Sequence, residues 1–184
     1  MERERIEAAE HRAKAARSAV TADYHAMLER KYVRAASHPW LSVDPDPLPP
    51  EHELWLTGVY WAERGQHAAA LTAYEQATKS NPDDFLALNS LAWLLATCPE
   101  DRIRDGKRAV DLAKRACELS AREVATCVET LAAAYAEAGD FEAASDTQRK
   151  AVGMLSTKDP RMEPCRSRLA QYVNHKPYRE ATNH

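Results

Sequence analysis

A helical pattern that recurs at fixed spacing constrains the fold of this chain more than any other feature. The recurring positions are Leu54, Gly58 and Trp61 in the first copy, Leu88, Ala92 and Leu95 in the second, and Val128, Ala132 and Tyr135 in the third. The middle position is small in every copy, as expected where two helices approach closely. A period of about 34 residues is typical of stacked helix-turn-helix units. Because such stacks build extended binding surfaces, the repeat favours a binding protein over an enzyme.

Glycine, asparagine and proline divide the pattern into helices. Gly65 and Gly139 stand between the helices of the first and third copies, where a left-handed backbone can end a helix. Asn81 is a good N-cap, and Pro82 suits a first helical residue because its missing N–H is not needed there. The pattern predicts helix pairs over residues 52–64 with 67–80, 84–97 with 105–119, and 123–138 with 141–155.

The second copy is longer than the others. The spacing from Ala70 to Ala109 exceeds the basic period, and the extra residues fall in the stretch 97–106. This stretch is polar and contains Pro99 and Gly106, so we expect an exposed loop.

The repeat resembles the tetratricopeptide repeat family over about residues 51–158. The first copy carries the family pattern through Leu54, Thr57, Gly58, Trp61, Ala70, Tyr74 and Pro82. The third carries it through Leu131, Ala132, Tyr135, Ala144 and Ala151, with Gln148 where an aromatic residue is usual. Residues 91–120 resemble a variant repeat found in many bacterial proteins of this family. The resemblance implies an all-α fold, a right-handed α-solenoid of three helix pairs whose first helices line a groove.

Three further segments flank the predicted solenoid, which spans residues 51–174 and ends in a capping helix over 160–174. Residues 1–36 form an alanine-rich, charged pattern that predicts a long helical arm over about 3–36. Five of the ten prolines fall in residues 37–50, which predicts an extended linker. Residues 175–184 predict an irregular tail. The arm is either a docking helix for another protein or packs back, through its second half, on the first repeat.

Charge and hydropathy narrow the class of partner. The formal net charge is −3, but residues 41–100 hold nine acidic and only two basic side chains. An acidic module repels nucleic acid, so we expect a protein partner with an apolar or basic segment, and no direct nucleic-acid partner. The mean hydropathy is −0.59 and the N-terminus is charged from Glu2, which predicts no membrane contact and a cytoplasmic location.

Motifs that carry chemistry are missing from the sequence. The four cysteines show no C-x-x-C spacing, and His52-Glu53 begins an H-E-x-x-H pattern that Leu56 breaks. The five glycines form no phosphate-binding or nucleophile motif. We therefore expect no catalytic residues, no metal site and no cofactor.

The first helix of each predicted pair presents a face toward the groove, and this face is the predicted partner-binding site. It comprises His52, Trp55, Val59 and Glu63; Asn89, Ser90, Trp93 and Thr97; and Glu129, Ala133 and Glu137. Two tryptophans beside acidic groups suit an apolar or basic helix or an extended segment. Alternatively, the chain's own N-terminal helix or linker covers Trp55 and Trp93.

Two functions of different class follow. The protein is a non-catalytic adaptor or scaffold that binds a partner through the groove and its N-terminal helix. Alternatively, it is a structural subunit of a larger complex or a homo-oligomer assembled through the arm, the convex face or the cap.

Overall fold

The computed structural model describes residues 54–120 and 125–181. These residues form seven α-helices and contain no strand, which confirms the all-α fold class for this part of the chain. The helices are α2 Leu54–Glu63, α3 His67–Ser80, α4 Phe85–Thr97, α5 Gly106–Leu119, α6 Ala125–Glu137, α7 Phe141–Met154 and α8 Met162–Val173. Each lies within a few residues of its predicted range. The predicted arm (1–36) and linker (37–50) lie outside the described residues.

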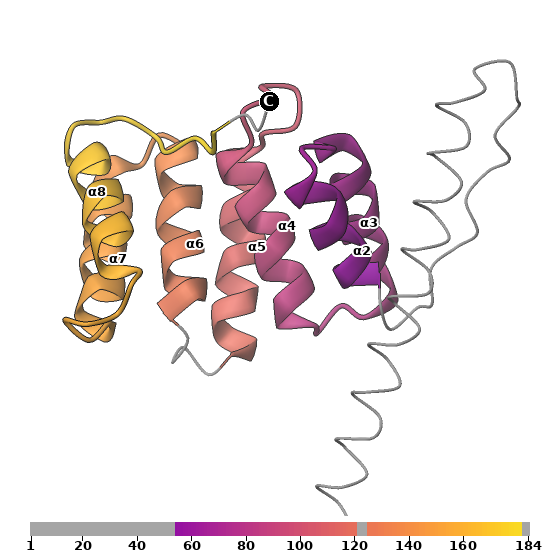
Figure 1. Ribbon diagram of the computed structural model, residues 1–184, viewed down its shortest axis with the longest axis horizontal. Helices are drawn as coiled ribbons and strands as arrows, with labels where there is room; N and C mark the ends of the chain where they lie inside the picture. Colours follow the sequence, from indigo (N-terminus) through magenta and orange to yellow (C-terminus); the bar gives the residue numbers. More distant parts are fainter. Residues whose placement is uncertain (1–53, 121–124, 182–184) are drawn as a thin grey trace, which may run out of the picture.

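Helices α2, α4 and α6 contact one another in that order and form an inner layer. Helices α3, α5 and α7 each pack against the helix before them, and α8 packs against α7. Figure 1 shows the resulting row, from α2 and α3 at one end to α7 and α8 at the other. The side chains at the contacts form the hydrophobic core, which runs along the row.

Small residues allow neighbouring helices to approach closely at the positions that the repeat predicted. Ala92, Ala132 and Ala144 have no exposed surface. Gly58 of α2 lies directly against the ring of Tyr74 in α3, so that a Cβ atom at this position would overlap the ring. The small position of the repeat is therefore a point of close helix contact.

Two of the predicted helix ends are confirmed and one is wrong. Gly65 and Gly139 have φ values of 69° and 85°, the left-handed backbone expected after α2 and α6. Asn81, however, is the C-cap of α3, and its backbone N–H bonds to Ala77 O. The N-cap of α4 is Asp84, whose carboxylate accepts from two backbone N–H groups of the first turn. A carboxylate also carries the charge that a helix N-terminus favours, which explains why the helix begins there.

The loop between α4 and α5 is less exposed than expected. Asp101 and Arg102 face solvent, but Cys98 is fully buried and Ile103 is 6% exposed. The Arg104 guanidinium donates to the carbonyls of Cys98 and Pro99, at 2.8 and 3.2 Å. The insertion is thus a folded element with its own apolar anchor.

Gln148 explains how the third pair tolerates a polar residue at its aromatic position. Its side chain is fully buried, and Nε2 donates to the Cys165 carbonyl of α8 at 3.0 Å. The amide therefore joins α7 to α8 through a hydrogen bond that a phenylalanine at this position could not make.

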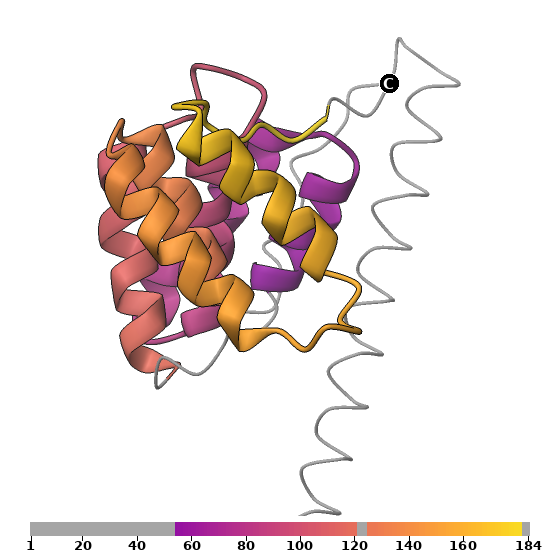
Figure 2. The same ribbon diagram turned by 90° about the vertical axis from the view of Figure 1, so that its left-hand side faces the viewer.

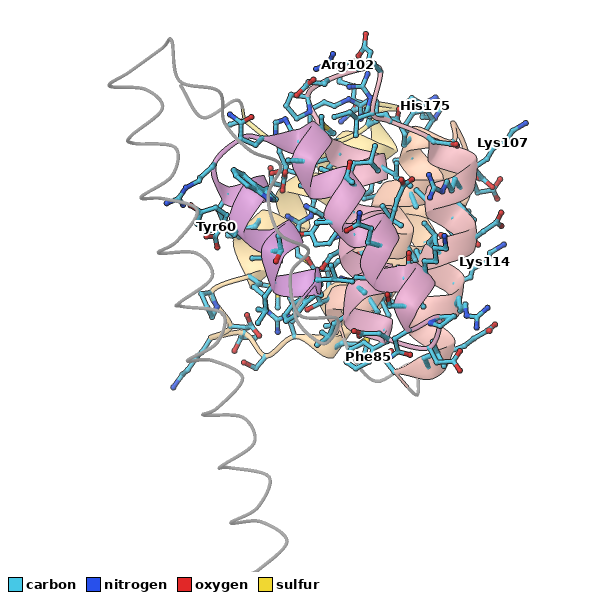
Figure 3. The ribbon with its side chains drawn as sticks, turned by 90° about the vertical axis from the view of Figure 1, so that its right-hand side faces the viewer. Tyr60, Phe85, Arg102, Lys107, Lys114 and His175 are labelled. Atoms are coloured by element: carbon cyan, nitrogen blue, oxygen red, sulfur yellow. The ribbon has the colours of Figure 1, made fainter. Side chains whose placement is uncertain are left out.

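The face of the molecule opposite the inner layer is charged. Lys107 and Lys114 of α5 point into solvent, as Figure 3 shows. Arg108 and Arg115 of the same helix form exposed ion pairs with Glu75 and Asp83, both at 2.7 Å. Such exposed pairs contribute little to stability and keep this face solvated.

Candidate functional site: a cleft on the inner layer

A cleft of about 650 Å³ opens on the inner layer. Its floor is formed by α4 and α6, one wall by the end of α2 and the start of α3, and the other wall by α8. Figure 2 gives the view from the α8 side. The lining of the cleft includes Glu63, Asn89, Ser90, Trp93, Glu129 and Arg168.

The α2 side of the cleft is held by a short polar network. Trp55 Nε1 donates to Ser90 Oγ at 2.8 Å, which joins α2 to α4. Tyr74 lies beside Ser90, and burial raises the pKa of its phenol far above the usual value. The phenol therefore stays protonated and serves as a hydrogen-bonding group of the wall. Asn89 Oδ1 is buried here with no hydrogen-bond partner, which leaves an acceptor available at the floor.

The α8 side is held by a buried ion pair. Arg168 of α8 pairs with Glu129 of α6, and their side chains are only 11% and 8% exposed. The Arg168 guanidinium also lies 5.7 Å from the Trp93 ring centroid, within reach of a cation–π contact. Glu129 Oε1 and Arg168 Nε have no hydrogen-bond partner. Both charges of the pair therefore retain unused hydrogen-bonding capacity beside the cleft.

The chain turns back across the inner layer after α8. His175 has a left-handed backbone, with φ 54°, and its ring stacks on Phe141 at 5.2 Å. Lys176 N–H then bonds to the Gln171 carbonyl at 2.9 Å. These contacts end the helix and direct residues 176–181, the tail segment, past α6 toward α4 (Figure 1).

The tail segment docks at one end of the cleft in an extended form. Trp93 Nε1 donates to Glu180 Oε1 at 2.6 Å, and Glu180 N–H donates to the Thr97 carbonyl at 3.0 Å. The Tyr178 ring lies 5.9 Å from that of Trp93, and Arg168 lies 5.5 Å from Tyr178. The segment thus places one aromatic and one acidic side chain on Trp93.

Glu137, at the end of α6, also holds the tail segment in place. Arg179 of the segment pairs with Glu137 at 2.5 Å, and Arg104 of the α4–α5 loop pairs with the same carboxylate at 3.0 Å. The Glu137 side chain is 13% exposed. One acidic residue at the end of α6 therefore holds two arginines from distant parts of the chain.

The structure separates the predicted site residues into three groups. Trp55, Val59, Glu63, Asn89, Ser90 and Trp93 lie on the inner layer with exposed or half-buried side chains. Thr97, Ala133 and Glu129 are 0%, 2% and 6% exposed, so they present no open surface, and Glu137 is engaged by Arg104 and Arg179. The third helix of the inner layer is closed because α8 and the tail segment lie over it. His52 lies outside the described residues.

Sequence reasoning missed the residues that α8 and the tail segment bring to the cleft. These are Arg168, Tyr178 and Glu180, while Arg179 binds Glu137 beside the cleft. The available signal was the sequence Tyr178-Arg179-Glu180, in which an aromatic residue is followed by a basic and an acidic one, close after a helix end. Such a segment has the groups needed to dock on an acidic, tryptophan-bearing surface.

The described cysteines lie in three places, one of which is Cys165, buried in α8 beside Gln148. Cys117 and Cys127 are buried at the contact of α5 and α6, where hydrogen bonding from the Cys117 thiol lowers the pKa of Cys127 to about 7. Cys98 lies beside His67 and Glu100, and burial raises the pKa of its thiol. The raised pKa makes the Cys98 thiol a weaker nucleophile than an ordinary cysteine.

Among the described residues, no helix has the length and apolar character needed to cross a lipid bilayer. Neither a scan against protein-family models nor a search of curated proteins gives a match to this chain.

Proposed function

We propose that this protein is a non-catalytic interaction module whose cleft binds an extended segment of a partner protein. The helix pairs α2–α3, α4–α5 and α6–α7 are, in this proposal, the units of a right-handed tetratricopeptide-like solenoid that α8 closes. The repeat positions and the small residues at the helix contacts support this reading.

One observation carries the proposal: an extended peptide, the tail segment, already docks at one end of the cleft. Its contacts combine a backbone hydrogen bond to Thr97, an aromatic ring tilted against Trp93 and an ion pair to Glu137. Main-chain bonds together with side-chain pockets are the usual means of recognising extended segments. The partner segment displaces the tail segment and takes over these contacts, so it carries an aromatic residue followed by a basic one. This chemistry fits the acidic character of the first repeats.

The experiment uses the full chain with three substitutions, Tyr178→Ala, Arg179→Ala and Glu180→Ala, which free the cleft. The probe is a fluorescent peptide with the sequence of residues 175–181, and binding is followed by anisotropy. We expect the peptide to bind this tail variant. Adding Trp93→Ala to the tail variant should abolish binding, because Tyr178 of the peptide then loses the ring against which it packs.

Tyr60→Ala is the matched control, since Tyr60 is a half-buried aromatic residue of α2 that does not line the cleft. Peptide binding that survives Trp93→Ala would refute the cleft as the binding site. A tail variant that binds no peptide but forms a stable dimer by light scattering would favour the structural-subunit alternative.

A further inference from the structure

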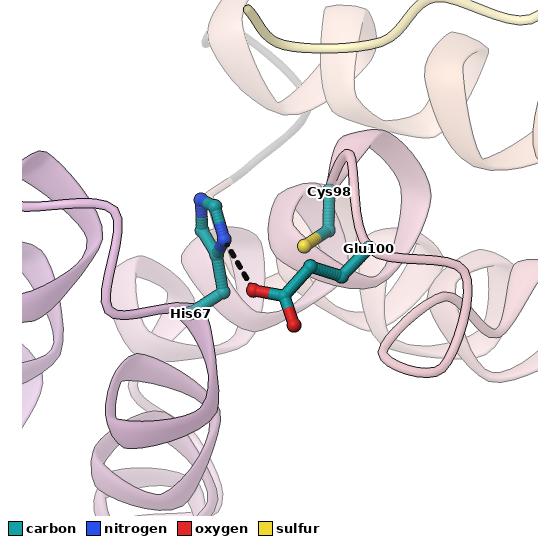
Figure 4. Close-up of side chains that lie close together, drawn as sticks. All are labelled: His67, Cys98 and Glu100. Atoms are coloured by element: carbon teal, nitrogen blue, oxygen red, sulfur yellow. Dashed lines mark hydrogen bonds and ion pairs between the residues drawn. The ribbon is translucent and has the colours of Figure 1, made fainter. Parts of the chain in front are cut away.

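The α4–α5 loop places two metal-binding side chains against the start of α3. His67 is the first residue of α3, Cys98 is the C-cap of α4, and Glu100 follows in the loop. One ring nitrogen of His67, Cys98 Sγ and one carboxylate oxygen of Glu100 all lie within 4.8 Å of one another. Figure 4 shows the three side chains converging, with the His67–Glu100 hydrogen bond of 2.9 Å drawn as a dashed line.

The loop that carries Cys98 and Glu100 is fixed by its own contacts. Ile103 is 6% exposed and its N–H bonds to the Glu100 carbonyl at 3.0 Å. Asp105 N–H bonds to the Leu95 carbonyl at 3.0 Å, which closes the loop against the end of α4. A ligand set on a fixed backbone loses little conformational freedom when a metal binds, so the loop is suited to present ligands.

The donor atoms point to one class of metal. An imidazole nitrogen, a sulfur and a carboxylate oxygen form a mixed set that suits Zn²⁺, whereas Mg²⁺ and Ca²⁺ require oxygen donors. Arg102 binds Glu100 Oε2 at 2.6 Å, and this leaves Oε1 directed at His67. The arginine orients the carboxylate in the manner of the outer-shell groups that support metal ligands.

The three side chains differ in their exposed fractions. Cys98 has no exposed surface, the His67 side chain is 11% exposed, and that of Glu100 is 32% exposed. A metal held here would be shielded on the sulfur side and open to water on the carboxylate side. Three protein ligands and one open position are a common zinc geometry.

We propose that His67, Cys98 and Glu100 bind a zinc ion that fastens the start of α3 to the α4–α5 loop. The ion takes the place of the hydrogen between His67 Nδ1 and Glu100 Oε1, the imidazole carries its proton at Nε2 instead, and the Cys98 thiol releases its proton to solvent. Ligand atoms of a tetrahedral zinc site lie about 3.3–3.8 Å apart, so the three donor atoms, all within 4.8 Å of one another, change their separations by about 1 Å or less. The inference does not rest on the proposed partner binding.

The test uses the full chain, first treated with a chelator and then titrated with Co²⁺ as a spectroscopic substitute for Zn²⁺. We expect a thiolate-to-cobalt charge-transfer band that Zn²⁺ removes by competition. Cys98→Ser should abolish the band. Cys117→Ser is the matched control, because Cys117 is a buried cysteine of the Cys117–Cys127 contact, and it should leave the band intact.

The site is overturned if the wild-type protein gives no thiolate band, or if the band persists in a folded Cys98→Ser variant. If Cys98→Ser fails to fold, Glu100→Ala decides, since Glu100 is the most exposed of the three ligands. Removing even an outer-shell group weakens metal binding by about 10–100-fold. A loss of zinc affinity smaller than about tenfold in Glu100→Ala would therefore also reject the site.

Discussion

Two glycines of this protein differ in how much space is available for a side chain at the Cα atom. Gly106 begins α5 directly against the end of α6, and a Cβ built there would lie 2.5 Å from the Ala138 backbone nitrogen. Gly153, near the end of α7, has no atom within 4 Å of the same position. Backbone atoms cannot move aside as a flexible side chain can, so the two sites should respond to alanine in opposite directions.

We expect Gly106→Ala to lower the free energy of unfolding by about 1–3 kcal/mol, since the added methyl group overpacks the contact. Gly153→Ala should raise it by about 0.5 kcal/mol because alanine restricts the unfolded chain. Urea unfolding followed by circular dichroism measures both. Equal stabilities for the two variants would show that α5 does not approach α6 as described.

The buried pair of Glu129 and Arg168 gives a second prediction at this scale. Arg168→Met should lower the free energy of unfolding by about 3 kcal/mol, because it leaves Glu129 buried without a counter-charge. Adding Glu129→Leu should restore most of the loss, since apolar residues of similar size can replace a buried pair. A double variant as unstable as Arg168→Met alone would contradict the burial of this pair. The measurement is thermal unfolding of four proteins that form a double-mutant cycle: the wild type, the two single variants and the double variant.

At the scale of the helices, the sequence predicted the existence and position of the helices and two of their junctions, but it misassigned the start of α4. Periodic apolar and small residues, such as Gly58 and Ala132, determine which face of a helix is buried, and this signal is local. The N-cap was misassigned because Asn81 and Asp84 both suit the role, and only the path of the chain after α3 decides between them. Gln148 appeared as a departure from the repeat because its partner, Cys165, lies on another helix.

The turn before α8 gives a prediction about pH. Arg161 binds the Asp159 carboxylate at 2.8 Å, and this side-chain bond, with the Arg161 backbone N–H, lowers the pKa of Asp159 below its usual value. A carboxyl with a lowered pKa in the folded state stabilises the protein above its ordinary pKa, and loses this effect as the pH falls through the lowered value. Asp159→Asn should therefore be less stable than the wild type at neutral pH.

The difference between the two proteins should disappear in acid, when Asp159 of the wild type is protonated. Urea midpoints measured across a pH series test this. A difference that stays constant with pH would show that the Asp159 charge does not contribute.

At the scale of the whole molecule, the cleft is formed by segments that no local pattern relates to each other. The sequence placed Trp55, Ser90 and Trp93 on one layer, since all three follow from the helical period. It did not place Arg168 and Glu180 beside Trp93, because their positions depend on the packing of α8 and on the turn at His175. The tail segment contacts Trp93, whereas the N-terminal helix and linker, the alternative cover for Trp55 and Trp93, lie outside the described residues.

The most direct test of the proposed function compares peptide affinity between the wild-type protein and the tail variant. A tethered segment competes at an effective concentration of about millimolar, so a peptide of residues 175–181 should bind the wild type at least about tenfold more weakly than the tail variant. The measurement is a titration of labelled peptide followed by anisotropy, with both full-length proteins. We predict that the wild type binds the peptide at least about tenfold more weakly than the tail variant does. Equal affinity for the two proteins would show that the tail segment and a partner do not share the cleft, and would contradict the proposal.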